Sequence, residues 1–84
     1  MDVGSVRSYI DNKLYSRVSN ISGASIGYAS INYNGSYFYC DIGINITSRS
    51  IMSSVERQLD SIFREIRSAV SPYDVRYSVG FVVL

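Results

Sequence analysis

Two runs of alternating apolar and polar residues meet at Asn34-Gly35, near the middle of the chain. An Asn-Gly pair between such runs predicts a two-residue type I′ hairpin, because both central residues of that turn adopt positive φ. The hairpin should cover about residues 25–47. Its short loop predicts a register in which Tyr28 faces Asp41.

Side chains alternate across a strand, so this register sorts the hairpin residues onto two faces. The first face is apolar and predicts a core formed by Gly27, Ala29, Ile31, Phe38, Cys40, Ile42, Ile44 and Ile46. The second face is aromatic and polar and predicts an exposed surface formed by Tyr28, Ser30, Asn32, Tyr37, Tyr39, Asp41 and Asn45.

Two further segments have the spacing of helices with one apolar side. The first, which Asp2 is placed to cap, has its apolar positions at Val3, Val6, Ile10, Leu14 and Val18. The second has them at Val55, Leu59, Ile62, Ile66 and Val70. It should begin with a capping box formed by Ser53 and Glu56, or one turn earlier at Ser50. Residues 75–84 alternate again and predict a third strand.

The order helix, strand, strand, helix, strand predicts an α+β fold. The economical arrangement is a two-layer sandwich with both helices on one face of a three-stranded sheet. We expect the strand order 3-1-2, with 1-2-3 as the alternative, since the split arrangement is common and keeps the crossover right-handed. The chain of 84 residues should form a single domain, residues 1–84. Two helices leave the far face of the sheet open.

Composition narrows the classes of function. Lys and Arg number 8 against 7 Asp and Glu, so no strong field attracts nucleic acid or anionic lipid. No apolar run reaches the roughly 18 residues of a membrane span, and the first residues do not resemble an export signal. The single cysteine, Cys40, falls on the predicted core face and cannot form an internal disulfide, which predicts a reducing, cytoplasmic setting.

The residue types that carry catalysis are largely missing. The segment Gly23-Ala-Ser25-Ile-Gly27 matches the nucleophile-elbow pattern, but the chain has no histidine base and the segment leads into a hairpin strand. A structural zinc site needs about four Cys or His ligands, and the chain offers one. We therefore expect a protein that is not an enzyme and that uses no metal and no cofactor.

The exposed face of the sheet is the candidate functional surface. Tyr28 and Tyr39 should be diagonal neighbours there, and Tyr37 lies two residues from Tyr39. In the 3-1-2 order, Arg76 and Ser78 of the third strand should join them. Tyrosine and arginine are enriched at protein-interface hot spots, so the three tyrosines and Arg76 predict a protein-binding site. The structural alternative is that tyrosine simply suits exposed strands.

Two other uses of the sheet are open. The same rings could stack single-stranded RNA or DNA bases, although the hairpin carries only one charged residue, Asp41. The third strand could also pair with a partner strand. Val82 and Leu84 are apolar on its outward side, and no Pro or Lys blocks its edge. Edge pairing would favour oligomers.

The order of elements, with its helix-strand rhythm from Tyr39 to Val83, resembles several small αββαβ modules. They are the ring-building domains of secretion and sporulation machines, the alkaline-shock protein family and, more distantly, the K-homology RNA-binding fold. The ring-building resemblance implies self-assembly through sheet edges and helices. The GxxG loop with which K-homology domains hold nucleic acid is absent, because Gly23 and Gly27 are four residues apart.

The sequence therefore predicts a non-enzymatic protein-interaction module. It would act as a homo-oligomer or as a small inhibitor or adaptor, of the kind frequent in viruses and mobile elements. A single-stranded nucleic-acid-binding domain is the alternative.

Overall fold

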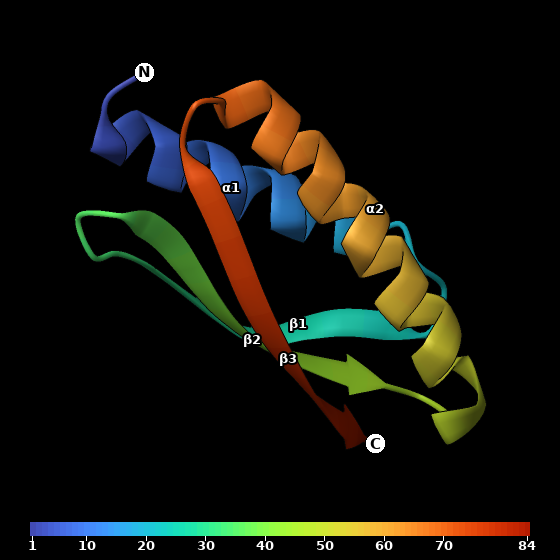
Figure 1. The fold of residues 1–84 in the computed structure, drawn as a ribbon. Helices are drawn as coiled ribbons and strands as arrows, with labels where there is room; N and C mark the ends of the chain where they lie inside the picture. The colour runs from blue at the N-terminus through green and yellow to red at the C-terminus, as the bar shows by residue number, and fades with distance from the viewer.

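Two helices cover one face of a three-stranded sheet, as the helical and alternating patterns predict (Figure 1). The computed structural model describes residues 1–84. The elements are α1 (Val3–Val18), β1 (Ala24–Tyr33), β2 (Tyr37–Ile46), the 3₁₀ turn η1 (Arg49–Ile51), α2 (Met52–Val70) and β3 (Asp74–Val83). The predicted α+β sandwich with both helices on one face is confirmed. Neither helix combines the length and the apolar character needed to cross a membrane.

Each helix packs its predicted apolar side on the sheet. At the start of α1, Asp2 Oδ1 accepts a hydrogen bond from Ser5 N at 2.8 Å, which lowers the pKa of Asp2. The start of α2 differs from prediction. Ser48 caps η1 by accepting from Ser50 N at 3.2 Å, and α2 continues from that turn without a side-chain cap of its own. The predicted capping box at Ser53 is therefore wrong.

The predicted strand order 3-1-2 is wrong, and the alternative order β1-β2-β3 is the observed one. β2 pairs antiparallel with β1 and parallel with β3. The physical reason lies in the row of side chains that each strand turns toward the helices. In β2 this row is fully buried and consists of Phe38, Cys40, Ile42, Ile44 and Ile46. The corresponding row of β1 is smaller and only half-buried. The central position, under both helices, thus belongs to the strand with the larger apolar row.

The hairpin turn is longer than predicted. Tyr33 pairs with Phe38, and Asn34 Oδ1 accepts hydrogen bonds from the backbone N–H groups of Ser36 and Tyr37, both at 2.9 Å. Gly35 has a φ of +95°, whereas no residue other than glycine has positive φ. The side chain of Asn34 thus supplies two of the turn's hydrogen bonds, and Asn34 N donates a third to Tyr37 O at 3.2 Å, so a type I′ backbone is not needed. The register shifts by an even number of residues and preserves the two faces.

A β-bulge at Gly27 interrupts β1. Ile26 pairs with Ile44 and Tyr28 pairs with Gly43, so Gly27 has no partner on β2. Gly27 is exposed rather than part of the core face, and Ile26 takes the half-buried position on the helix side. The bulge corrects the predicted alternation at the beginning of the hairpin.

Specific contacts connect the two layers. The ring of Tyr77 on β3 stacks on Phe63 of α2 with centroids 4.1 Å apart, and its hydroxyl donates a hydrogen bond to Asp60. Cys40 lies in the core, where burial raises the pKa of its thiol to about 12. A thiol with this pKa is protonated at neutral pH and behaves as a small hydrophobic group.

Candidate interaction surface

The sheet face opposite the helices is the candidate site, and we call it the open face. β2 contributes Tyr37, Tyr39, Asp41, Gly43 and Asn45, while β3 contributes the alternating residues from Asp74 to Val82. Tyr28, Ser30 and Asn32 come from β1. Tyr39 is 41% exposed and Tyr28 is 53% exposed, although both lie within regular strands.

Tyr37 and Arg76 meet directly on the open face. The guanidinium carbon of Arg76 lies 3.9 Å from the centroid of the Tyr37 ring, which is a cation–π contact. Arg76 Nε also donates to Asp74 Oδ2 at 2.9 Å. The arginine is thus oriented by an aromatic ring and by a carboxylate on its own strand. The order β1-β2-β3 makes this contact possible because it places β3 beside β2.

Tyr39 continues this arrangement along β2. It is the register partner of Arg76, and its hydroxyl donates to Ser78 Oγ at 2.8 Å. Ser78 Oγ lies 3.5 Å from Asp41 Oδ1. We call Tyr37, Tyr39, Asp41, Arg76 and Ser78 the Tyr-Arg cluster. Three of the four predicted site residues are therefore brought together.

Tyr28, the fourth predicted residue, lies apart from the cluster. It pairs with Gly43, while Tyr39 pairs with Asn32, so Tyr28 and Tyr39 are not the diagonal neighbours that the predicted register required. The Tyr28 ring packs over Gly43, since a Cβ atom built on Gly43 would lie only 2.1 Å from Tyr28 Cε1. Tyr28 therefore has a packing role that the sequence pattern did not reveal.

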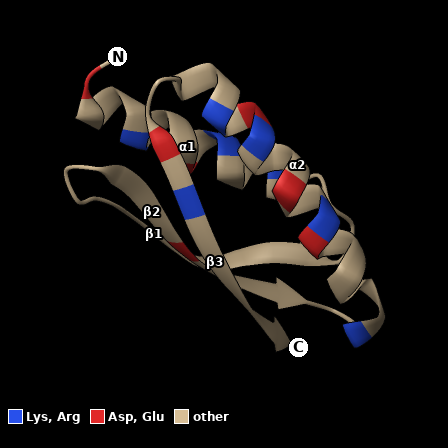
Figure 2. Cartoon of the chain, in the orientation of Figure 1, with Lys and Arg blue, Asp and Glu red and all other residues tan.

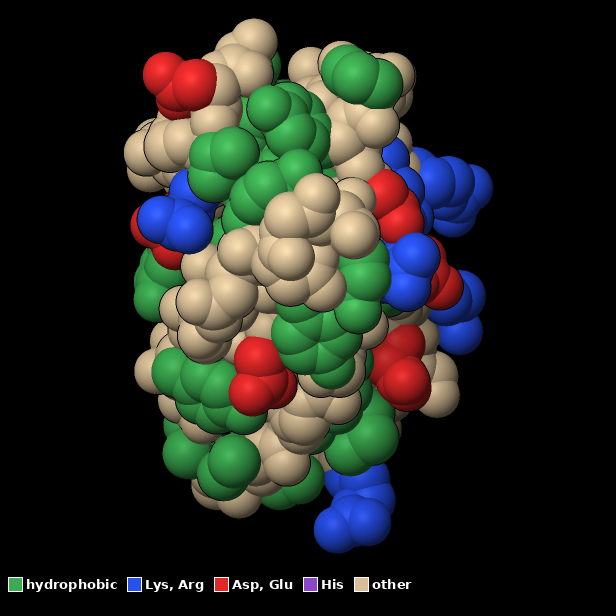
Figure 3. All heavy atoms as spheres, turned by 60° about the vertical axis from the view of Figure 1, so that its left-hand side comes forward, with side chains coloured by type: hydrophobic (Ala, Val, Ile, Leu, Met, Phe, Trp, Pro, Cys, Tyr) green, Lys and Arg blue, Asp and Glu red, His purple; other side chains and the backbone are tan.

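The open face carries few charges. The strands contain three charged residues, namely Asp41, Asp74 and Arg76, and the others lie on the helices and connecting segments (Figure 2). Hydrophobic and tyrosine side chains cover much of the side of the molecule seen in Figure 3. Arg76 is paired with Asp74, while Asp41 takes part in no ion pair. The formal charge of this face is therefore slightly negative.

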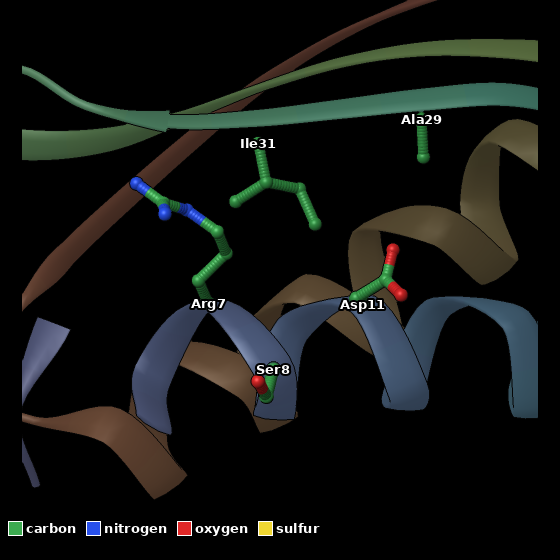
Figure 4. Close-up of a pocket in the computed structure, with 5 residues that line it drawn as sticks. All are labelled: Arg7, Ser8, Asp11, Ala29 and Ile31. Atoms are coloured by element: carbon green, nitrogen blue, oxygen red, sulfur yellow. The ribbon is translucent and has the colours of Figure 1, made fainter. Parts of the chain in front are cut away.

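Other surface features are weak candidates for chemistry. Ser25 is exposed on β1 opposite Asn45 and has no histidine base in the chain. A hollow of about 260 Å³ lies between α1 and β1, where Arg7 and Asp11 extend from the helix toward the strand, and Ala29 and Ile31 point from the strand toward the helix (Figure 4). These two charged side chains form no ion pair with each other. No group of three or more His, Cys, Asp or Glu side chains could hold a metal ion.

Sequence reasoning expected Asp41 and Ser78 on the open face but missed their contacts within the Tyr-Arg cluster. Asp41 and Ser78 occupy matching register positions on β2 and β3, so their approach depends on the strand order. The signal that could have found them was the strongly apolar helix-facing row of β2. A central β2 places β3 against it and brings the two residues together.

No protein-family model and no curated protein sequence matches the chain. Among solved structures, the chain is similar to forms of a domain called MamM CTD. A doubly substituted form has a TM-score of 0.62 and 12% identity, and the alignment covers 96% of each chain. A singly substituted form has a TM-score of 0.56 and 12% identity over 94% of this chain and 99% of the other. A copper form has a TM-score of 0.55 and 11% identity over 96% and 91%. At these identities the likeness shows a shared fold.

Proposed function

We propose that this chain is a non-enzymatic protein-interaction module that docks its open face on a folded protein partner. The observation that carries the proposal is the Tyr-Arg cluster. Tyr39 keeps 41% of its surface exposed while its hydroxyl is held by Ser78, and Arg76 is fixed between Tyr37 and Asp74. Such side chains lose little conformational freedom on binding, and aromatic anchors of this kind dominate interface energies.

The charges of the cluster indicate the chemistry of the partner. Arg76 already has a carboxylate partner, whereas Asp41 is exposed and unpaired. A complementary surface would place a lysine or arginine opposite Asp41 and apolar groups over the two tyrosine rings. One of the similar structures is a copper form, but we do not include copper in the proposal. No group of three or more His, Cys, Asp or Glu side chains in this chain could hold a metal ion.

The charges of the open face also disfavour the binding of nucleic acid. Phosphate groups need several cations, and the open face offers one arginine that is already paired beside two carboxylates. Within the proposal the chain works in a reducing, cytoplasmic setting, where the buried Cys40 stays a thiol. The inhibitor or adaptor role and the viral or mobile-element origin stay predictions from the sequence.

Site-specific photo-crosslinking in the source cells provides the test. A crosslinking amino acid at Asn32, on the open face beside Tyr39, should capture a defined protein that a crosslinker at Arg57 on α2 does not. The purified partner is then titrated with the wild type and with the Tyr37→Ala/Tyr39→Ala double variant. We expect its affinity to fall by about thirtyfold or more, the size of an interface hot spot.

Tyr15→Ala is the matched control, because Tyr15 is 47% exposed on α1 and lies away from the open face. It should leave the affinity unchanged, and both variants should keep the wild-type circular dichroism. Equal affinity of the wild type and the double variant would refute the proposal. Retention on single-stranded oligonucleotides at low salt that the double variant loses would replace it with the nucleic-acid alternative.

A further inference from the structure

The outer edge of β3 has no partner strand, and two hydrogen bonds reveal which backbone groups it presents. Leu84 N donates to Ile46 O of β2 at 2.9 Å, so the even-numbered residues turn their backbone groups toward β2. On the other side, Arg67 Nε donates to Val75 O at 2.8 Å. Because these directions alternate along a strand, the odd-numbered residues from Val75 to Val83 turn theirs toward the free edge.

This edge lacks the usual features that prevent strand addition. The register of β3 with β2 is continuous, whereas the other edge of the sheet, β1, is interrupted by the bulge at Gly27. Residues 77–83 contain no proline and no charged side chain. Arg67 covers the edge only at Val75. An unprotected segment therefore extends from Tyr77 to Val83.

The apolar side chains of this segment lose their cover toward the end of the strand. Val75 is fully buried, Val79 and Phe81 are half-buried, and Val83 is 43% exposed. In Figure 1, α2 and β3 lie together where they are joined and diverge toward the C-terminal end of β3. The helix layer thus leaves part of the helix-facing row of β3 without a packing partner.

We propose that β3 pairs antiparallel with β3 of a second copy, about a two-fold axis at Gly80. In this register Tyr77 faces Val83 of the second copy and Val79 faces its Phe81, as hydrogen-bonded pairs. Every free odd-numbered residue of the segment is used, which gives about eight backbone hydrogen bonds across the axis. The product is a continuous six-stranded sheet with all helices on one side.

The free backbone groups of β3 and its uncharged side chains select both the register and the occupant. An axis at Val79 would need the carbonyl of Val75, which Arg67 already occupies. An axis at Phe81 would set Tyr77 opposite a position beyond Val83, where β3 ends. With the axis at Gly80, the uncharged segment pairs with the same segment of the second copy, so no like charges face each other. The half-buried side chains of Val79 and Phe81 from the two copies then form one apolar strip. The free edge of β3 is therefore complementary to the same edge of a second copy.

This dimer is independent of the proposed open-face function, since it uses the edge of the sheet and leaves the Tyr-Arg cluster accessible. Its test begins with Val79→Pro. The N–H of Val79 points to the free edge, so proline there removes no hydrogen bond to β2 but blocks strand addition. Val79→Ala is the matched control, because it shortens the same side chain and keeps the N–H.

Sedimentation equilibrium over micromolar to millimolar concentrations measures the result. We expect the wild type and Val79→Ala to dimerise, and Val79→Pro to remain a monomer with wild-type circular dichroism. A monomeric wild type at millimolar concentration would overturn the proposal, as would a Val79→Pro variant that dimerises like the wild type.

Cysteine variants test the register and do not depend on the proline variant folding. A Cβ on Gly80 meets no atom within 4 Å, so Gly80→Cys fits the fold, and its thiol would face the thiol of the second copy across the axis. Mild oxidation should give a covalent dimer of Gly80→Cys. Val82→Cys, on the same strand and face, should form far less of it because it faces Ser78 of the second copy. Equal yields would refute the Gly80 axis.

Discussion

β2 presents two rows of side chains from a single backbone, and the two rows differ in their physical roles. The helix-facing row is fully buried from Phe38 to Ile46 and belongs to one core cluster with the buried residues of both helices. The open-face row contains Tyr37, Tyr39 and Asp41, which are held by contacts with β3 rather than by burial. The difference teaches that order and burial are separable in this sheet: the open-face side chains are oriented but still accessible.

The two rows should therefore respond differently to truncation. Ile42→Ala removes a fully buried side chain and should lower the free energy of unfolding by about 2–5 kcal/mol. Tyr39→Ala removes a larger side chain from the same strand but should cost no more than about 1 kcal/mol, since it is partly exposed. Urea unfolding followed by circular dichroism measures both values. Similar losses for the two variants would contradict the division of roles.

Gly43 is the open-face position of β2 on which the Tyr28 ring packs. A Cβ there would overlap the Tyr28 ring, so Gly43→Ala should displace that ring and lower the free energy of unfolding by about 1–3 kcal/mol. The Tyr28→Ala variant removes the obstacle. In a double-mutant cycle, Gly43→Ala should cost much less in the Tyr28→Ala background. An equal cost in both backgrounds would mean that the Tyr28 ring does not cause the effect.

The sequence patterns predicted the helices, the strands and the faces of the sheet because these depend on local periodicity. The helix-facing row of β2 and the outward positions of Tyr37, Tyr39 and Arg76 follow directly from alternation. Even the wrong hairpin register preserved these faces, because it was shifted by an even number of residues.

The strand order and the exact register could not be read from periodicity, because they depend on contacts between distant residues. The Asn34 side chain formed the turn by hydrogen bonding, and the bulge at Gly27 changed the alternation of β1. The longer turn displaced Tyr28 from the cluster, because the register set there continues without interruption from Tyr33 to Tyr28. Asp41 and Ser78 joined it only because β3 lies beside β2. Most of the candidate site thus followed from the faces, and its internal contacts followed from the topology.

The smallest expected effect is a pH dependence of the free energy of unfolding, which should distinguish the helix-facing Tyr77 from the open-face Tyr39. Burial, assisted by the hydrogen bond to Asp60, raises the pKa of Tyr77 from 10.0 to about 12. The folded state therefore retains the Tyr77 proton in a range where the unfolded state loses it. This contribution to stability is complete below about pH 10 and is lost as the pH rises toward about 12.

Tyr77→Phe keeps the ring that stacks on Phe63 and removes the titrating hydroxyl. Its free energy of unfolding should consequently fall less steeply than that of the wild type as the pH rises between about 10 and 12. Tyr39→Phe on the open face is the control and should retain the wild-type slope, because Tyr77 is still present. The raised pKa of Cys40 acts in the same direction in all three proteins and cancels from the comparison. Urea unfolding across this pH range measures the slopes, and parallel curves for Tyr77→Phe and the wild type would show that the Tyr77 hydroxyl does not couple folding to pH.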